Sequence, residues 1–208
     1  MSSSLPGNLG SVSTTGGPNL QEYVLQGTIL DQSAEALVHR LRALCDNVDQ
    51  GLETFRDHEM VFALHTGGQT NNQVMLRARR SLDQADSPWQ LRYLGQTDLS
   101  DKSRAVTVRS YLDALTSDTL PAFLNDIGFR LDHEFVAKGH MFRKGKMKVL
   151  VSKLFKFQKP NDLQNLEAMT SSRLVELSVV APSGSENIAD DMKVFAEQLK
   201  PLVSMDKV

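Results

Sequence analysis

The segment KMKVLVSKLFKF at residues 146–157 indicates the fold class more directly than any other part of the chain. Its apolar and polar side chains largely alternate, and alternation marks a β-strand because successive side chains point to opposite faces of a sheet. One face carries Met147, Val149, Val151, Phe155 and Phe157. The other face carries Lys146, Lys148, Ser152 and Lys156, with Leu150 and Leu154 among them. A strand that is apolar on one side and mixed on the other is typical of an antiparallel sheet.

The same two-residue period recurs along most of the chain. It predicts further strands near 21–30, 58–66, 73–81, 88–95, 104–112, 129–137, 140–144 and 173–181. Between 129–137 and 140–144 we expect Gly139 to interrupt the strand. This many strands with few helices indicate one large, mostly antiparallel sheet. Because an open sheet leaves unpaired edges, we expect the sheet to close into a barrel of about eight strands.

Three segments have helical periodicity instead. Apolar side chains recur at three- and four-residue steps over 34–48, a short second helix is expected over 121–128, and a third over 187–202. The predicted fold class is therefore mostly β (α+β), a single antiparallel β-barrel with three flanking helices.

The length of 208 residues fits one domain, which we place at 20–208. Residues 1–19 carry no charge and consist mainly of Ser, Gly, Thr, Pro and Asn, so they are predicted to form a flexible arm. A polar stretch near 158–172 is predicted to form a soft loop between two strands.

The formal net charge of −2 hides a division along the chain. Residues 129–159 hold nine Lys and Arg against two Asp and Glu, a net of +7, whereas 20–128 carry −5 and 160–208 carry −4. The basic block is either a solvated face of two strands or a surface that docks onto an acidic protein or onto nucleic acid. Sequence-specific nucleic-acid binding is not expected, because no zinc finger, helix-turn-helix or ribonucleoprotein motif is present.

Motifs for catalysis and cofactors are missing from the sequence. Cys45, the single cysteine, falls on the apolar stripe of the first helix, where a buried inert thiol is the ordinary case. His133 and His140 lack metal-ligand spacing, and no nucleophile elbow, phosphate loop or dinucleotide fingerprint occurs. No apolar run reaches the ~18 residues of a membrane helix. We therefore expect no cofactor, no metal site and no catalytic residue.

One enzymatic alternative remains open. Antiparallel barrels that hydrolyse triphosphates line a tunnel with Arg and Lys and hold a divalent metal with glutamates two residues apart. The candidate charges for the lumen or for a partner are Arg77, Arg79, Arg92, Arg143, Lys146, Lys148, Glu134 and Glu176. The glutamate pairs that would bind the metal are missing, because Val136 and Ser178 stand where the second carboxylates would belong.

Several blocks closely resemble one known family. They are LRALCDN (41–47), HEMVF (58–62), LRARRS (76–81), WQLRYLGQ (89–96), GFRLDHEFVAKGHMFRKG (128–145), LVELSVVAP (174–182) and DDMKVFAEQLKPLV (190–203). From about residue 20 to the end, the chain resembles the animal form of the Mediator complex subunit eighteen family. The arm and the 158–172 loop match least.

The resemblance implies a nuclear, non-enzymatic subunit of the Mediator head module, a coactivator that bridges transcription regulators and RNA polymerase II. It implies a β-barrel that forms a heterodimer with a related barrel, subunit twenty, and is tethered by a tail helix of subunit eight. The family has no catalytic motif to transfer, and its interface residues are not placed by the sequence. The alternative, a residual metal-dependent triphosphate-tunnel phosphohydrolase, shares the barrel shape.

Overall fold

A computed structural model describes residues 19–46, 51–65, 73–98, 104–159, 162–185 and 187–208. The strands are β1 (Leu20–Leu30), β2 (Glu53–His65), β3 (Gln73–Ser81), β4 (Trp89–Thr97), β5 (Thr107–Thr116), β6 (Arg130–Lys144), β7 (Met147–Phe157), β8 (Leu166–Ala168) and β9 (Ser172–Pro182). The α-helices are α1 (Ala34–Leu44), α2 (Leu120–Asp126) and α3 (Ile188–Glu197), and a 3₁₀ turn, Asp31–Ser33, precedes α1.

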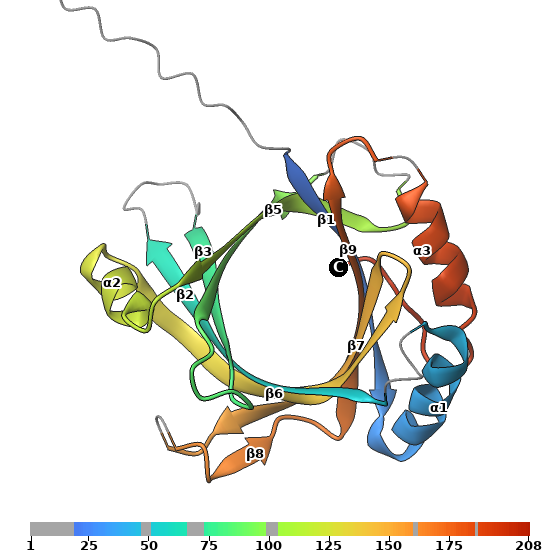
Figure 1. Cartoon of the computed structure of the whole chain (residues 1–208), viewed down its shortest axis with the longest axis horizontal. Coiled ribbons are helices and arrows are strands. Elements are labelled where there is room, and N and C mark those ends of the chain that lie inside the picture. The colour runs from blue at the N-terminus through green and yellow to red at the C-terminus, as the bar shows by residue number, and fades with distance from the viewer. Residues whose placement is uncertain (1–18, 47–50, 66–72, 99–103, 160–161, 186) are drawn as a thin grey trace, which may run out of the picture.

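Eight of the strands found in the described residues close into a ring (Figure 1). Their order is β6-β2-β3-β4-β5-β1-β9-β7, every neighbouring pair is antiparallel, and β7 pairs back onto β6. The short strand β8 pairs with the end of β7. Closure removes the sheet edges, so the predicted barrel and its three flanking helices are confirmed.

The larger hydrophobic core lies on the outside of the barrel. The helices α1 and α3 cover the outer face of β1, β7 and β9 (Figure 1). Leu37 and Leu41 of α1 and Met192 of α3 are fully buried in it, against Val149 and Leu177 of the sheet. Full burial of each such side chain contributes about 1.5–3 kcal/mol, so the helices hold this side of the barrel in shape.

A second core forms under α2. There Leu120 and Leu124 pack with Phe62 of β2, Trp89 of β4 and Phe129. No helix in the described residues is both long and apolar enough to cross a membrane.

Gly139 does not interrupt its strand, contrary to the prediction. The expected strands 129–137 and 140–144 form one continuous strand, β6, with Gly139 directly opposite Ser152 of β7. A Cβ atom at Gly139 would lie 2.1 Å from the carbonyl oxygen of Val151. Glycine is therefore required because the two backbones approach closely, not because the chain turns.

We expect Gly139→Ala to lower the free energy of unfolding by about 1–3 kcal/mol, since a methyl group there must displace backbone. Gly95→Ala is the matched control, because the new Cβ would lie 3.0 Å from the Ser110 side chain and no closer than 3.6 Å to backbone. Denaturant unfolding of both variants checks this, and equal losses would contradict it.

Other boundaries also differ from the sequence prediction. Strand β2 begins at Glu53, five residues before the predicted start, and α1 ends at Leu44. The stretch 158–172, predicted as a loop, contains β8. The predicted arm lies outside the described residues except for Asn19.

Candidate functional site in the barrel lumen

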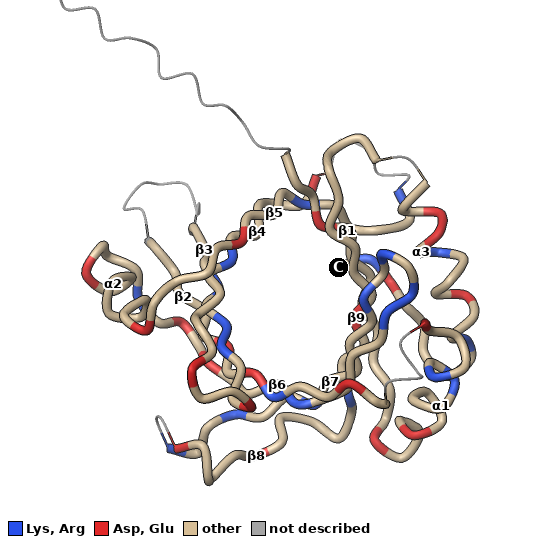
Figure 2. The backbone as a smooth tube through the Cα atoms, in the orientation of Figure 1, with Lys and Arg blue, Asp and Glu red and all other residues tan. Residues whose placement is uncertain are grey.

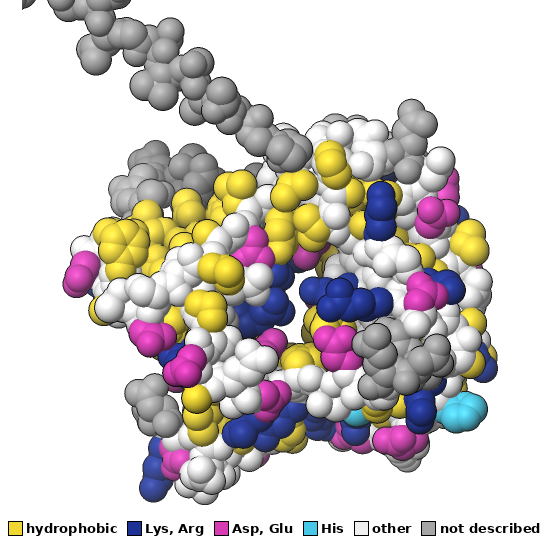
Figure 3. Space-filling view, viewed as in Figure 1, with side chains coloured by type: hydrophobic (Ala, Val, Ile, Leu, Met, Phe, Trp, Pro, Cys, Tyr) yellow, Lys and Arg dark blue, Asp and Glu magenta, His cyan; other side chains and the backbone are white. Residues whose placement is uncertain are grey.

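Charged side chains of β2, β3, β4 and β9 line a cavity of about 230 Å³ inside the ring. The lining is contributed by Gln26, Phe55, Asp57, Glu59, Arg77, Arg79, Gln90, Arg92, Phe135, Ala137, Leu150, Ser152, Leu154, Leu174 and Glu176. Lys and Arg side chains are visible on both sides of the central opening (Figure 3). The barrel thus has a charged lumen, whereas its outer face under α1 and α3 is apolar, and the lumen is therefore a candidate functional site.

Four of the predicted charges line this cavity: Arg77 and Arg79 on β3, Arg92 on β4 and Glu176 on β9. Lys148 on β7 belongs to the same group, since its charge interacts with those of Arg79, Arg92 and Glu176. Burial first, and then the two arginines, lower the pKa of Lys148.

The other three predicted charges do not line the cavity. The Glu134 carboxylate accepts a hydrogen bond of 2.8 Å from His58, and the His58 ring contacts the rings of Trp89 and Phe157. Arg143 is largely exposed, 3.8 Å from Glu53, and Lys146 lies in the exposed turn between β6 and β7.

Carboxylates of the chain itself neutralise most of the lumen cations. The Arg77 guanidinium lies 3.5 Å from Glu59, and that of Arg79 lies 3.8 Å from Asp57. Arg79 also donates to the Gln90 side-chain oxygen. The cations of this β3 row are thus already occupied within the protein.

Two further ion pairs connect β4 with β5 and β5 with β1. Arg92 donates to Asp113 at 3.1 Å, and its guanidinium stacks 4.9 Å from the Tyr111 ring centre. Arg109 donates to Glu22 at 2.7 Å, and Glu22 is the one buried charged residue in the described part of the chain. Burial, followed by the hydrogen bond to Asp113, raises the pKa of Tyr111 to about 12.

Asp57 and Glu59 form the carboxylate pair that the sequence analysis missed. They stand two residues apart on β2 and both face the lumen. The signal was present as alternation in the sequence, but the predicted strand began only at 58. Burial raises the pKa of Asp57, and its Arg79 partner opposes this rise.

This pair is a poor metal site. Each of its carboxylates faces an arginine, and the described residues contain no group of three or more His, Cys, Asp or Glu side chains placed to hold a metal ion. Cys45 is also a poor nucleophile, because burial and then Asp46 raise the pKa of its thiol to about 11. The lumen arrangement therefore offers ion pairing within the barrel, with no assembled set of acid, base and metal ligands.

The fold and the lumen define a class: a closed antiparallel tunnel barrel whose internal cations are largely neutralised by its own carboxylates. The family described as Med18 protein matches residues 21–208. A curated protein of Danio rerio, "Mediator of RNA polymerase II transcription subunit 18", is 55% identical over 195 residues, which cover 93% of this chain and 92% of that protein. The chain belongs to the Med18 family, and the resemblance found in the sequence is confirmed.

Solved structures agree on the fold. A chain in the structure of the Schizosaccharomyces pombe Mediator head module matches with a TM-score of 0.71 at 15% identity, covering 90% of this chain and 98% of that one. The triphosphatase of the Mimivirus capping enzyme matches with a TM-score of 0.57 at 9% identity, covering 88% of this chain and 90% of that one. At such identities the likeness is one of fold alone.

Proposed function

We propose that the protein is a non-enzymatic subunit of the Mediator complex, acting in RNA polymerase II transcription as a protein-interaction module. The single observation that carries this proposal is the relationship to the Danio rerio subunit, which spans nearly the whole of both chains. The barrel of the Schizosaccharomyces pombe head module supports the assignment to the head module. A place in this complex implies a nuclear location.

The non-enzymatic part of the proposal is supported by the lumen. Arg77, Arg79 and Arg92 are held by Glu59, Asp57 and Asp113, so a triphosphate would have to displace these carboxylates. A release of phosphate from triphosphate-ended RNA with Mn²⁺ or Mg²⁺, lost on Glu176→Gln, would contradict the proposal and favour the phosphohydrolase.

Partner binding is supported by an exposed apolar surface. Phe123 and Ile127, four residues apart on and just after α2, are 54% and 50% exposed. Hydrophobic side chains gather over this part of the molecule (Figure 3). Clustered exposed apolar groups of this size mark protein interfaces more often than isolated ones do.

The proposed partners are the related barrel of subunit twenty and the tail helix of subunit eight. An amphipathic helix binds by placing its apolar face against an apolar surface, and the surface around α2 is of that kind. A tagged copy of the protein should therefore recover Mediator head subunits from nuclear extract, and their consistent absence would contradict the assignment to the complex.

Changing Phe123→Asp together with Ile127→Asp should reduce this recovery at least tenfold, because two carboxylates would have to be desolvated in the interface. Val194→Asp is the matched control, since Val194 is 61% exposed but lies on α3, away from this surface. Quantitative immunoblotting of head subunits checks the result, with thermal unfolding to show that each variant is folded. Undiminished recovery would show that the partner binds elsewhere on the barrel.

A further inference from the structure

A row of cations crosses the outer face of the barrel, on the opposite side of the sheet from the lumen. Arg56 of β2 is the direct cross-strand neighbour of Lys138 of β6, and Lys138 is the direct neighbour of Lys153 of β7. Arg173, on β9, lies at the end of the same groove. Like charges directly opposite in a sheet are destabilising, so three in a row require an explanation.

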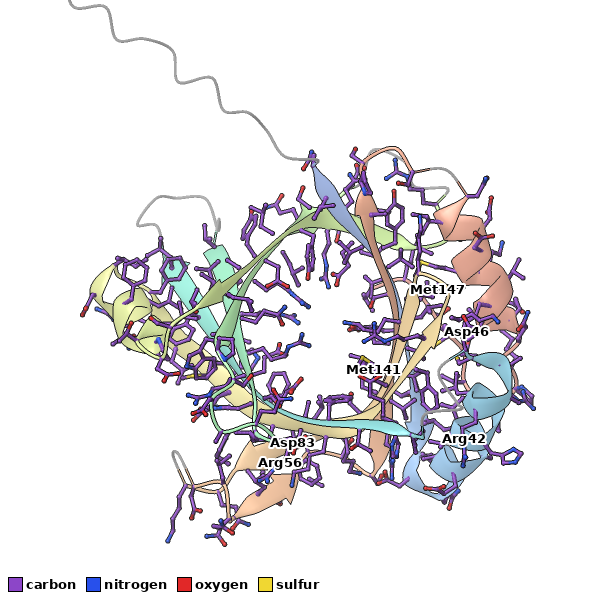
Figure 4. All side chains as sticks on the ribbon, viewed as in Figure 1. Arg42, Asp46, Arg56, Asp83, Met141 and Met147 are labelled. Carbon is purple, nitrogen blue, oxygen red and sulfur yellow. The ribbon has the colours of Figure 1, made fainter. Side chains whose placement is uncertain are left out.

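These side chains border an open groove of about 580 Å³, called here the outer basic groove. Besides these four cations, its lining includes Asp31, Asp83 and His140. Figure 4 shows Arg56 and Asp83 close together on the outside of the ring. Lys and Arg positions recur along the β6 and β7 side of the barrel (Figure 2).

One end of the row is neutralised from within the chain. Asp31 accepts hydrogen bonds from Lys153 and from Arg173, whose Nε lies 3.4 Å away. A single carboxylate therefore serves two cations, and the hydrogen bonds with Lys153 hold the pKa of Asp31 below its usual value.

At the other end the two cations are not ion-paired within the described part of the chain, although Asp83 lies in the same groove. Among the described residues, neither Arg56 nor Lys138 forms an ion pair, and the Nε atom of Arg56 is buried without a hydrogen-bond partner. The Lys138 ammonium lies 4.7 Å from the centre of the Phe155 ring. Burial and then the charge of Arg56 lower the pKa of Lys138, a further sign of uncompensated positive charge.

His140, two residues after Lys138 on the same face of β6, adds a third polar group to this end. Its Nδ1 atom is buried and has no partner within the described chain. Burial and then Arg173 lower the pKa of His140. Arg56, Lys138 and His140 thus line one groove in which two buried nitrogen atoms, Arg56 Nε and His140 Nδ1, have no hydrogen-bond partner among the described residues.

We propose that the outer basic groove binds an acidic peptide segment of a partner protein, with a carboxylate seated between Arg56 and Lys138. An anion at this position would relieve the like-charge contact and pair with a guanidinium whose planar donors suit carboxylates. This interaction goes beyond membership of any particular complex, because it rests on the groove alone.

The groove favours a peptide over nucleic acid. Strands lie about 4.8 Å apart, so Arg56 and Lys153 are only ~10 Å apart, and two of the four cations already share Asp31. Stable backbone binding to a duplex engages about 6–10 phosphates, more than this row can meet.

The experiment measures binding of a fluorescein-labelled octaglutamate peptide to the full chain by fluorescence anisotropy. Lys138→Glu should weaken binding at least tenfold, and Lys138→Gln should weaken it by a smaller factor. Lys146→Glu is the matched control, because it makes the same charge change in the exposed turn of the same basic block. It should leave the affinity within about twofold of the wild type.

Thermal unfolding provides a second readout. If Lys138 served only to stabilise the fold, Lys138→Glu would lower the melting temperature. Lys138→Glu places a carboxylate between Arg56 and Lys153, and the cross-strand ion pairs should raise the melting temperature by about 2–4 °C. The proposal thus expects a more stable protein that binds less well. Lys138→Gln keeps the binding test valid if Lys138→Glu fails to fold.

Three outcomes would overturn the proposal. The first is no binding of octaglutamate to the wild type at millimolar concentration. The second is an equal loss of affinity in Lys138→Glu and Lys146→Glu. The third is equal affinity for a single-stranded oligouridylate of the same charge, lost by the same factor in Lys138→Glu, since this would identify a nucleic-acid or general polyanion site.

Discussion

Replacing Glu22 with alanine should lower the free energy of unfolding by about 3–5 kcal/mol, one of the two largest effects that we expect of a single change in this protein. The Glu22 side chain is 5% exposed and lies 2.7 Å from the Arg109 guanidinium, which is 18% exposed. Removing the carboxylate leaves this guanidinium desolvated and unpaired, which is costlier than the pair itself is favourable.

Two further variants separate a lost pair from a lost side chain. Glu22→Ala with Arg109→Met removes both charges and should recover a substantial part of the loss. Glu53→Ala is the control, because its partner Arg143 lies 3.8 Å away and both side chains are well exposed, so the expected change is at most about 1 kcal/mol. Urea unfolding of all three variants measures the losses of unfolding free energy. A loss for Glu22→Ala no greater than that for Glu53→Ala would refute the prediction.

Phe142→Ala should cost about 3–5 kcal/mol for a different reason. Phe142 is 1% exposed on the outer face of β6, within the core that α1 and α3 cover. Truncation leaves a cavity as large as a phenyl ring, and the closed barrel restricts how far the neighbouring strands can move to fill it.

The control for this variant is Leu131→Ala on the same strand, where the side chain is 42% exposed. Its loss of unfolding free energy should stay well below half of that for Phe142→Ala, since the Leu131 side chain buries less apolar area on folding. Calorimetric melting of both variants is the measurement. A comparable loss in the two would mean that strand propensity, and not packing under the helices, sets the stability of β6.

The barrel was predictable from the sequence because its outer and inner faces differ in polarity. The alternation in 146–157 correctly separates Met147, Val149 and Val151, which face outward, from Leu150 and Ser152, which line the lumen. Gly139 shows the limit of such a pattern. Glycine weakens a strand on average, but it can also sit within a continuous strand where the partner backbone approaches closely.

The lumen was predictable only in part. The arginines of β3 and β4 stand out as alternating charges, but their partners Asp57 and Asp113 come from other strands. Which carboxylate meets which cation depends on the register between strands, and a single sequence does not contain that register. The outer row of Arg56, Lys138 and Lys153 escaped notice for the same reason, since only two of its members fall in the basic block.

The pairing of β1 with β9 has a consequence for the making of this protein in the cell. Leu20 pairs with Pro182, so β1 must wait for β9 before the ring can close. The other neighbour of β1, β5, also follows long after it. Pairing at this sequence distance is slow because loop-closure entropy is lost before the contacts form. During synthesis, therefore, β1 keeps an unpaired edge until β9 has emerged, and the growing chain is exposed to misassociation in that interval.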